Sequence, residues 1–372
     1  MTPSTQRVTI VLVLRHNVPE MTRPEMLENR NSGAAMRSLV LGGSTFVGRR
    51  LVRHLVDQGG KVAVLNRGRT VSDLPASVGR IIGDRTNAES MRQALDGGEW
   101  DAVFDVSGFA MIASGSPFEE LLGLLDGKVG AYVFVSSVMA YQPTPVMPWT
   151  EDFPVRDEPP TTYGGFKAYA EAVISERFHR TGFPGSVARP AAIYGPDNNI
   201  HDMETAMFLR LRRGLPILLP EQGLVTTSYG HVDDLCVLLV AMAVNPATRG
   251  EVVNATGQAI TSAGYIDVLA DIVGVQPDVH LIPEHLAGRL EAGLYGHLFK
   301  PRHHGILSTE KARVVLGLPE ERGFTAGHRD TYEWFCASPL VDAPDSLSDP
   351  VWGSGFDFAA EARALQVLSD HR

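Results

Sequence analysis

The chain has 372 residues, of which 44% are apolar and 20% charged, and its formal net charge is −10 at pH 7. This composition is ordinary for a soluble globular protein with a buried core, and the acidic excess argues against a general affinity for nucleic acid or anionic membranes. The two cysteines, Cys236 and Cys336, lie a hundred residues apart without a metal-type spacing. No disulfide framework is expected, and a reducing cytoplasm fits best.

Residues 1–35 show neither a helical nor a strand period. We expect a poorly ordered extension or an over-long translation start. The apolar run from Val8 to Leu14 is too short to span a bilayer. A signal peptide is the alternative, but no small-residue cleavage site follows the run closely.

From Arg37 onward, short apolar segments alternate with helical ones. The expected strands are RSLVL, KVAVLN, RII, DAVFDVS, AYVFVSS and GSVARP, and the expected helices are FVGRRLVRHLVDQG, Ala88 to Leu95, Pro117 to Leu125 and the segment that contains Tyr163. Such alternation predicts βαβ units and a parallel sheet. Runs such as VFVSS are apolar without a period of two, so we expect an α/β doubly wound fold with both faces of the sheet covered.

A glycine-rich turn, Leu41-Gly42-Gly43-Ser44-Thr45-Phe46-Val47-Gly48, opens the first helix. Glycine lets backbone N–H groups approach a pyrophosphate, and the helix N-terminus favours its negative charge. The order of strand, turn, helix and strand predicts dinucleotide binding, with contacts from Gly42, Thr45, Phe46, Val47 and Gly48. Thr45 stands where the G-x-x-G-x-x-G pattern has its middle glycine, and a small residue there still permits close approach.

The second strand ends in Asn66-Arg67-Gly68-Arg69, without the acidic residue that binds a free ribose 2′-hydroxyl. An arginine at this place suits a 2′-phosphate. We therefore expect NADP(H) in preference to NAD(H), with Asn66 and Arg67 at the cofactor. The alternative is that Arg67 and Arg69 point into solvent.

Three more residues at strand ends are expected to contact the cofactor. Asp84 and Arg85 follow the third strand in GDRT, and Ser107 follows the fourth. Asp84 is placed to accept a hydrogen bond from the adenine amino group, although an ordinary turn residue has the same appearance in sequence.

After Pro190 the pattern becomes irregular, with frequent proline and glycine. We expect helices at Met203 to Arg213 and Val232 to Ala243, a strand near Glu251 to Asn254, and mostly helices from Ser262 to His304. The expected organisation is a cofactor-binding sheet domain of residues 36–190 and 229–258, a smaller, mostly helical substrate lobe of residues 191–228 and 259–340, and a tail of residues 341–372 with a helix from Asp357.

Tyr163 and Lys167 stand four residues apart, so a helix places both side chains on one face. A phenol ionises at roughly pH 10 in water, and a lysine ammonium one turn away lowers that pKa by stabilising the phenolate. The pair therefore predicts a site of proton transfer. Taken alone, the same spacing also fits a surface Tyr/Lys pair.

In this order, the glycine turn, GDRT, VFVSS, YGGFK and ARPAAIYGP resemble the extended or atypical short-chain dehydrogenase/reductase superfamily, in its NAD-dependent epimerase/dehydratase branch. The resemblance covers roughly residues 36–340. It implies a Rossmann-type domain, an NAD(P) cofactor and a catalytic Ser-Tyr-Lys set. It assigns these roles to Ser137, with Ser136 as the alternative, to Tyr163 as acid and base, and to Lys167, which also binds the nicotinamide ribose. Ile193 lies where the family approaches the nicotinamide amide.

Two positions depart from the nucleotide-sugar members of that family. Alanines at positions 191–192 replace their usual asparagine, and Thr227 replaces an arginine that binds the diphosphate. Arg210, Arg212 and Arg213 are candidates to supply the missing charge, although arginines on a helix more often form a solvated face.

The histidines His297, His303 and His304 invite a metal site. They share no ligand spacing with a carboxylate or cysteine, so no metal is expected. The segment from His231 to Asp234 resembles a catalytic relay, and we interpret it as a structural turn.

Acidic residues precede Tyr163 at Glu151, Asp152 and Glu158. We expect them in solvent. The alternative is that one of them acts as an acid or base, because this loop often overhangs the substrate in the family.

Three hypotheses for function follow. The first is an enzyme that oxidises, reduces or epimerises a secondary alcohol or ketone of a sugar-like, nucleotide-linked or free, substrate. The second is an NADPH-dependent carbonyl reductase of a non-nucleotide metabolite, favoured by Arg67 and the absent diphosphate anchors. The third is a redox-silent nucleotide-sensing or RNA-associated relative, which the retention of Ser137, Tyr163 and Lys167 disfavours. A small-molecule substrate is expected, with neither nucleic acid nor membrane as partner, and a homodimer is expected by analogy alone.

Overall fold

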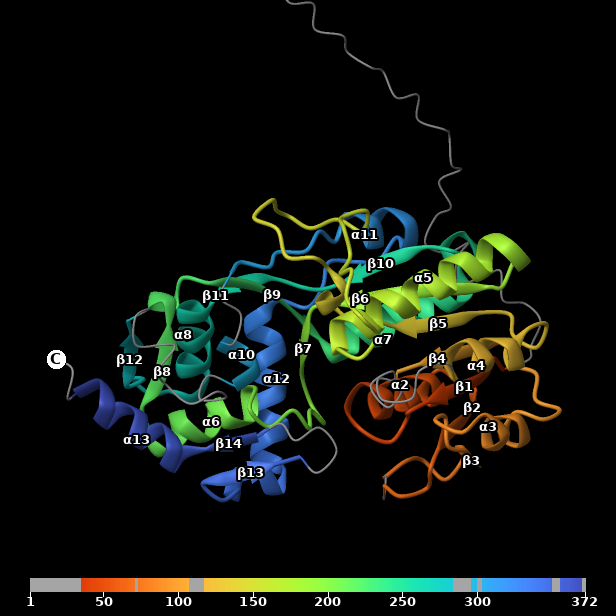
Figure 1. Ribbon diagram of the computed structural model, residues 1–372. Helices are drawn as coiled ribbons and strands as arrows, with labels where there is room; N and C mark the ends of the chain where they lie inside the picture. The colour runs from red at the N-terminus through yellow and green to blue at the C-terminus, as the bar shows by residue number, and fades with distance from the viewer. Residues whose placement is uncertain are drawn as a thin grey trace, which may run out of the picture. The chain divides into compact units, whose positions relative to one another are not determined.

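The structure is a computed structural model that describes residues 35–70, 73–106, 117–283, 296–299, 303–349 and 355–369 (Figure 1). Residues 35–372 form one compact unit. The expectation for residues 1–35 therefore lies almost wholly outside the described residues.

A parallel sheet forms the centre of this unit. Its strands are β1 (Arg37–Leu41), β2 (Lys61–Asn66), β3 (Gly79–Ile82), β4 (Ala102–Asp105), β5 (Tyr132–Val135), β6 (Gly185–Pro190) and β10 (Val252–Ala255). They lie in the order β10-β6-β5-β4-β1-β2-β3, and every neighbouring pair is parallel. The order reverses between β1 and β4, and ligands of such sheets bind at the carboxyl ends of the strands beside that point. The predicted α/β doubly wound fold is confirmed.

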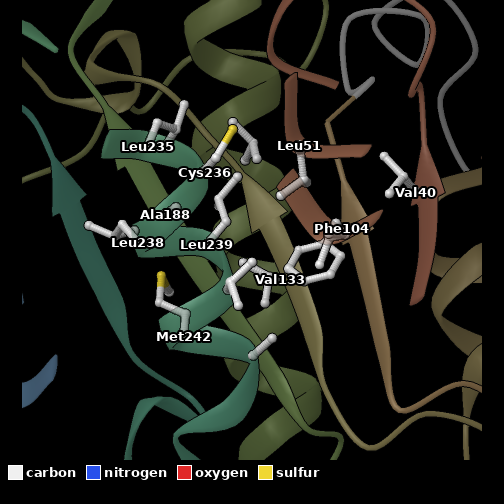
Figure 2. Packing of buried hydrophobic residues seen from close by; sticks show 14 of the residues in the cluster. Val40, Leu51, Phe104, Val133, Ala188, Leu235, Cys236, Leu238, Leu239 and Met242 are labelled. Atoms are coloured by element: carbon white, nitrogen blue, oxygen red, sulfur yellow. The ribbon is translucent and has the colours of Figure 1, made fainter. Parts of the chain in front are cut away.

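Helices cover both faces of the sheet. Those on one face are α2 (Phe46–Asp57), α7 (Val232–Val244) and α11 (Glu310–Leu316), and those on the other are α3 (Ala88–Ala94), α4 (Pro117–Leu125) and α5 (Tyr163–Thr181). Figure 2 shows the first core, where Leu51 of α2 and Leu239 of α7 lie with Val133 of β5. Along β1, Val40 joins this core and Leu39 the opposite one. Burial on both faces explains why the strands read as unbroken apolar runs.

A second group of elements follows β6. The strands β7 (Ala192–Tyr194), β9 (Thr226–His231) and β11 (Ala259–Thr261) form a sheet in the order β11-β9-β7, and β8 (Ile217–Pro220) pairs with β12 (Val279–Ile282). The helices α6 (Glu204–Arg213), α8 (Ser262–Val273), α10 (Gly296–Phe299) and α12 (Phe324–Ala337) pack around a third core. Within the stretch Ser262 to His304, where helices were expected to dominate, the described residues hold α8, α10 and the unexpected strand β12. These strands are only three to six residues long, too short for a hydrophobic period to reveal them.

Among the described residues, the 3-10 helices are η2 (Val138–Ala140), η3 (Glu221–Gly223), η4 (Pro246–Thr248) and η5 (Pro339–Asp342). Within the described ranges, no helix combines the length and apolar character that crossing a membrane requires.

The C-terminal segment packs on the third core. It contains β13 (Ser346–Ser348), β14 (Gly355–Asp357) and α13 (Phe358–Ser369), which is the helix expected from Asp357. Arg210 of α6 donates from Nε to Glu361 of α13 at 2.9 Å, and its guanidinium lies 5.1 Å from the centre of the Phe358 ring. Arg213 pairs with Asp345 at 2.8 Å. The expectation of a solvated arginine face is therefore wrong for Arg210, whose charge is already paired inside the protein.

Glu361→Ala tests how strongly α13 is held. The side chains of Arg210 and Glu361 are 9% and 7% exposed, so the substitution leaves a buried, unpaired guanidinium and should cost about 3–5 kcal/mol of unfolding free energy. Glu176→Ala is the control, because its pair with Arg180 on α5 is 71% and 64% exposed and should contribute less than about 1 kcal/mol. Urea denaturation measures both, and equal costs would contradict the described packing.

Candidate active site

The glycine-rich turn between β1 and α2 is closed by direct backbone packing. Gly42 has a φ of +92°, which favours glycine, and its N–H donates to Leu65 of β2 at 3.2 Å. A Cβ on Gly48 would lie 2.2 Å from the carbonyl oxygen of Gly42, so no side chain fits there. Thr45 caps α2 without a side-chain hydrogen bond, and the first turn of α2 holds no acidic residue. The N-terminus of α2 is thus suited to an anion.

The carboxyl ends of β2 and β3 carry the residues expected at the adenosine. The side-chain amide of Asn66 donates to the hydroxyl of Ser44 at 2.7 Å, which ties β2 to the glycine turn. Arg67 and Arg69 are exposed. Asp84 accepts hydrogen bonds from the backbone and hydroxyl of Thr86, and these lower the pKa of its carboxyl, with smaller contributions from the two arginines. Both charges of Arg67 and Arg69 therefore lie close enough to Asp84 to act on it.

Three further candidate cofactor residues follow β3, β4 and β6 in the chain. The Arg85 side chain turns into the protein and forms a bidentate pair with Asp105, at 2.6 and 2.8 Å, so its guanidinium is already engaged. Ser107 lies outside the described residues. Ile193 is buried on β7, beside the sheet.

Helix α5 approaches η2 closely because two glycines follow Tyr163. A Cβ on Gly164 would lie 2.4 Å from the carbonyl oxygen of Met139, and one on Gly165 would lie 2.3 Å from that of Pro159. Thr162 caps the helix by accepting a hydrogen bond from the N–H of Gly165 at 3.0 Å. The pair of glycines in YGGFK thus brings Tyr163 against the segment that follows β5.

The two serines after β5 have different partners. Ser137 shares a hydrogen bond with the Tyr163 phenol, and its hydroxyl accepts from the N–H of Met139 at 3.1 Å. Ser136 instead donates to the buried carboxylate of Glu171. Ser137 therefore lies at the tyrosine, whereas Ser136 is held in a buried polar cluster.

Lys167 is buried beneath Tyr163. Its ammonium group donates to the carbonyl oxygen of Val135 at 2.6 Å and lies 5.5 Å from the centre of the Tyr163 ring. Burial lowers the pKa of Lys167 to about 8, against the opposing attraction of Asp105 and Glu171. Burial also raises the pKa of Tyr163, opposed by the hydrogen bond of Ser137. The expectation that Lys167 lowers the pKa of Tyr163 is therefore wrong, because burial raises that pKa.

Sequence reasoning missed the buried charges around Lys167. Glu171 follows Tyr163 and Lys167 at the next helical repeat of four, a signal visible in the sequence. It pairs with Arg189 of β6 at 2.5 Å, and the Arg189 guanidinium lies 4.1 Å from the centre of the Tyr141 ring. Asp105 gave no signal beyond its place at the end of β4.

The segment from His231 to Asp234 is not a turn, as interpreted from the sequence, but the junction where β9 ends at His231 and α7 begins at Val232, and its side chains make structural contacts. His231 caps α7 by accepting from the N–H of Asp233 at 3.2 Å, and Asp233 forms a bidentate pair with Arg50 of α2. Asp234 accepts from the backbone N–H of Arg322 at 2.8 Å.

The acidic loop before Tyr163 is only partly solvated. Asp152 and Glu158 are exposed, as expected. Glu151 is half-buried and accepts from the backbone N–H of Asn254 on β10 at 2.8 Å, so the expectation of a solvated carboxylate is wrong there.

The remaining candidates hold no shared site. His304 accepts from the N–H of Thr226 at 3.0 Å, and His303 is exposed. Across the described residues, no three His, Cys, Asp or Glu side chains gather in a way that would hold a metal ion. Cys236 is buried and Cys336 exposed, and both are free thiols.

The sequence matches the model of the NAD dependent epimerase/dehydratase family over residues 38–116 and 119–256. The chain belongs to this family. It is 27% identical over 319 residues to the chloroplast stem-loop binding protein of 41 kDa b of Arabidopsis thaliana, a match that covers 81% of this chain and 80% of the relative. It is 25% identical over 335 residues to UDP-glucose 4-epimerase of Streptomyces lividans, covering 81% and 96%.

A solved structure with the same fold is the dTDP-glucose 4,6-dehydratase DesIV of Streptomyces venezuelae, with NAD bound. The TM-score is 0.66 at 22% identity, and the match covers 82% of this chain and 100% of the dehydratase. The turn of this epimerase/dehydratase family member fits such a dinucleotide, because Gly48 keeps its backbone free of side chains and the N-terminus of α2 has no side-chain cap.

Gly48→Ala should weaken dinucleotide binding. Its new Cβ would meet the carbonyl oxygen of Gly42 at 2.2 Å, so the turn must open, and we expect NADH and NADPH affinity to fall roughly tenfold or more. Gly123→Ala on α4 is the matched control, because the nearest atom to its Cβ is the end of Arg177 at 3.7 Å. Fluorescence titration of the reduced dinucleotides measures both, with thermal unfolding to confirm the fold. Unchanged affinity in Gly48→Ala would place the cofactor elsewhere.

Proposed function

We propose that the protein is an NAD(P)-dependent oxidoreductase of the extended short-chain dehydrogenase/reductase type, which acts on a secondary alcohol or ketone of a sugar-like substrate. The observation that carries the proposal is the meeting of Ser137, Tyr163 and Lys167 at the carboxyl end of β5. In this proposal residues 36–190 and 229–258 bind the cofactor, and residues 191–228 and 259–340 bind the substrate.

Tyr163 is the proton-transferring group in this proposal. Its raised pKa keeps the phenol protonated at neutral pH, so it is ready to donate to a carbonyl oxygen that is being reduced. Ser137, already hydrogen-bonded to the phenol, orients the same substrate oxygen. When bound, the nicotinamide supplies hydride exchange with the carbon that carries this oxygen.

Lys167 contributes a fixed charge and a donor. With a pKa of about 8 the ammonium is mostly protonated at pH 7, and its position 5.5 Å from the Tyr163 ring favours negative charge that develops on the phenol during transfer. It is also the residue we assign to the nicotinamide ribose.

The other cofactor contacts stay as proposed from the sequence. Gly42, Thr45, Phe46, Val47 and Gly48 surround the pyrophosphate, and Asn66, Arg67, Asp84, Ser107 and Ile193 contact the two nucleoside ends. We leave the Arg85 side chain out of this set, and its pairing with Asp105 supports that choice.

The hypotheses for function differ in the class of substrate, and a different observation supports each of them. The named activities of the Streptomyces relatives support a nucleotide-linked sugar and an epimerase or dehydratase. The buried pairing of Arg210 with Glu361 removes one candidate diphosphate anchor, and this favours a carbonyl reductase of a non-nucleotide metabolite. The Arabidopsis relative, which is named a stem-loop binding protein, supports the third hypothesis, a redox-silent nucleotide-sensing or RNA-associated relative.

A substrate screen distinguishes these functions. Purified protein is incubated with NADPH or NADH and panels of ketones and nucleotide sugars. Net oxidation of the cofactor identifies a reductase, and isomer formation without cofactor loss identifies an epimerase. Cofactor binding with no turnover on any panel would favour the RNA-associated hypothesis.

Tyr163→Phe should abolish most of the turnover found in that screen. Loss of the phenolic proton removes a general acid-base group and should lower kcat about 10²–10⁴-fold with little change in cofactor affinity. Tyr169→Phe is the control, because Tyr169 lies on the same helix and bonds the exposed Glu119 at 2.9 Å. A Tyr163→Phe enzyme with the activity of the control would refute the assignment.

Arg67→Ala tests the preference for NADP(H). If this arginine binds a 2′-phosphate, its loss removes a charge-assisted contact and should weaken NADPH roughly 10-fold or more while NADH changes little. Arg92→Ala, at an exposed pair on α3, should alter neither affinity. Isothermal titration of both dinucleotides provides the comparison, and equal effects on NADPH and NADH would rule the preference out.

A further inference from the structure

Two buried ion pairs flank the ammonium group of Lys167. One joins Asp105, at the end of β4, to Arg85, which follows β3. The other joins Glu171 of α5 to Arg189 of β6. All four side chains are less than a tenth exposed. The proposed proton-transfer residues use neither pair directly.

Asp105 is the more deeply buried of the two carboxylates. It accepts from Arg85 Nη1 at 2.6 Å, from Arg85 Nη2 at 2.8 Å and from the hydroxyl of Tyr132 at 2.8 Å. It is completely buried. Burial would raise the pKa of Asp105, but the charge and hydrogen bonds of Arg85, with Tyr132, outweigh it and lower that pKa. Asp105 therefore stays anionic throughout the neutral range.

The sheet register brings Asp105 and Lys167 to the same place. Asp105 lies opposite Phe134 in the pairing of β4 with β5. The Lys167 ammonium lies 4.7 Å from the centre of the Phe134 ring and bonds the next carbonyl, that of Val135. Phe134 of β5 thus lies against the Lys167 ammonium and is the strand neighbour of Asp105.

Stability alone does not explain this cluster. Burying an ion pair costs several kcal/mol per ion, and apolar residues of similar volume serve a core equally well or better. The pair borders one of the apolar cores, because Tyr132, which bonds Asp105, belongs to it. A role for the charges themselves accounts for their presence beside a buried lysine.

We propose that Asp105 is a positioning residue of the site: its carboxylate, held by Arg85 and Tyr132, keeps Lys167 protonated next to Tyr163, and Arg85 limits that effect. This inference rests on the proposed function of Lys167. Through Lys167, the Asp105 cluster maintains a positive charge beside Tyr163 while the phenol gives up its proton.

Charged groups from every neighbouring element support these signs. Burial lowers the pKa of Lys167 most, Asp105 of β4 raises it, Arg85 lowers it, and Glu171 of α5 raises it. Tyr132 of β5 stays protonated as a donor, because burial and Asp105 raise its pKa. Neutralising Asp105 should therefore make Lys167 lose its proton at lower pH, and neutralising Arg85 should do the opposite.

The protonation of Lys167 can be measured directly, because the chain contains only five lysines. They are Lys61, Lys128, Lys167, Lys300 and Lys311. In the full chain labelled with ¹³Cε-lysine, NMR follows each amine through a pH titration, and the signal missing from Lys167→Met assigns Lys167. We expect a midpoint of about 8 in the unmodified protein. Asp105→Asn should lower it by roughly one pH unit or more, and Arg85→Gln should raise it.

Opposite shifts from two members of one ion pair are not produced by a merely structural role. Glu89→Gln, at an exposed site on α3, is the control and should leave the midpoint in place. An unchanged Lys167 midpoint in Asp105→Asn, or shifts of the same sign in both variants, overturns the proposal. If Asp105→Asn does not fold, Arg85→Gln decides, because loss of the Arg85 charge should raise the Lys167 midpoint. Absence of a rise in the variant that folds counts against the proposal.

The titration needs neither substrate nor turnover, so it separates this inference from the proposed function. Turnover that survives Tyr163→Phe overturns the function whatever the lysine does. If an active enzyme shows no response of Lys167 to Asp105, only the inference fails.

Discussion

The positive charge of Lys167 is the constraint on which the centre of this molecule depends. An ammonium group that is 3% exposed has lost its hydration, which costs several kcal/mol, so it persists only where dipoles and anions replace the water. The carbonyl of Val135 does so directly, and carboxylates on β4 and α5 act on it from two sides. Each carboxylate is paired in turn with a buried arginine, so charges of alternating sign run through the protein beneath the proposed site. A role in the proposed proton transfer explains this arrangement of buried charges better than a contribution to folding stability does.

Backbone packing without side chains builds the two ends of the same site. At the glycine turn, Gly48 lets α2 rest on the carbonyl of Gly42, which leaves the helix N-terminus open to an anion. At α5, Gly164 and Gly165 let the helix approach η2, which brings the phenol of Tyr163 to Ser137. Both contacts lie beside the reversal of strand order between β1 and β4, the usual ligand site of this kind of sheet. The fold of the epimerase/dehydratase family thus brings the glycine turn and Tyr163 to the carboxyl ends of the strands, where we propose that the dinucleotide binds.

Local patterns in the sequence were sufficient to predict the sheet, the helices around it and the family. Each of these has a period or a motif that is visible in neighbouring residues. The Tyr163 and Lys167 pair was visible for the same reason. Contacts between residues that are far apart in the sequence could not be predicted in this way. In the sequence, Arg210 is one of three arginines on a helix, and nothing near it indicates that it pairs with the distant Glu361. Likewise, nothing near Arg85 indicates that its side chain pairs with Asp105 inside the protein. The direction of the Tyr163 pKa depends on burial, which spacing along a helix does not encode. The short strands β7 and β11 owe their existence to their partner β9.

The most direct measurement of the central claim is a crystal structure of the protein grown with NADPH. The account predicts a pyrophosphate on the N-terminus of α2 and a nicotinamide whose ribose lies within hydrogen-bond distance of Lys167, with the Tyr163 hydroxyl facing the ring. A dinucleotide bound at any other place, or a Tyr163 hydroxyl directed away from the nicotinamide, would contradict it.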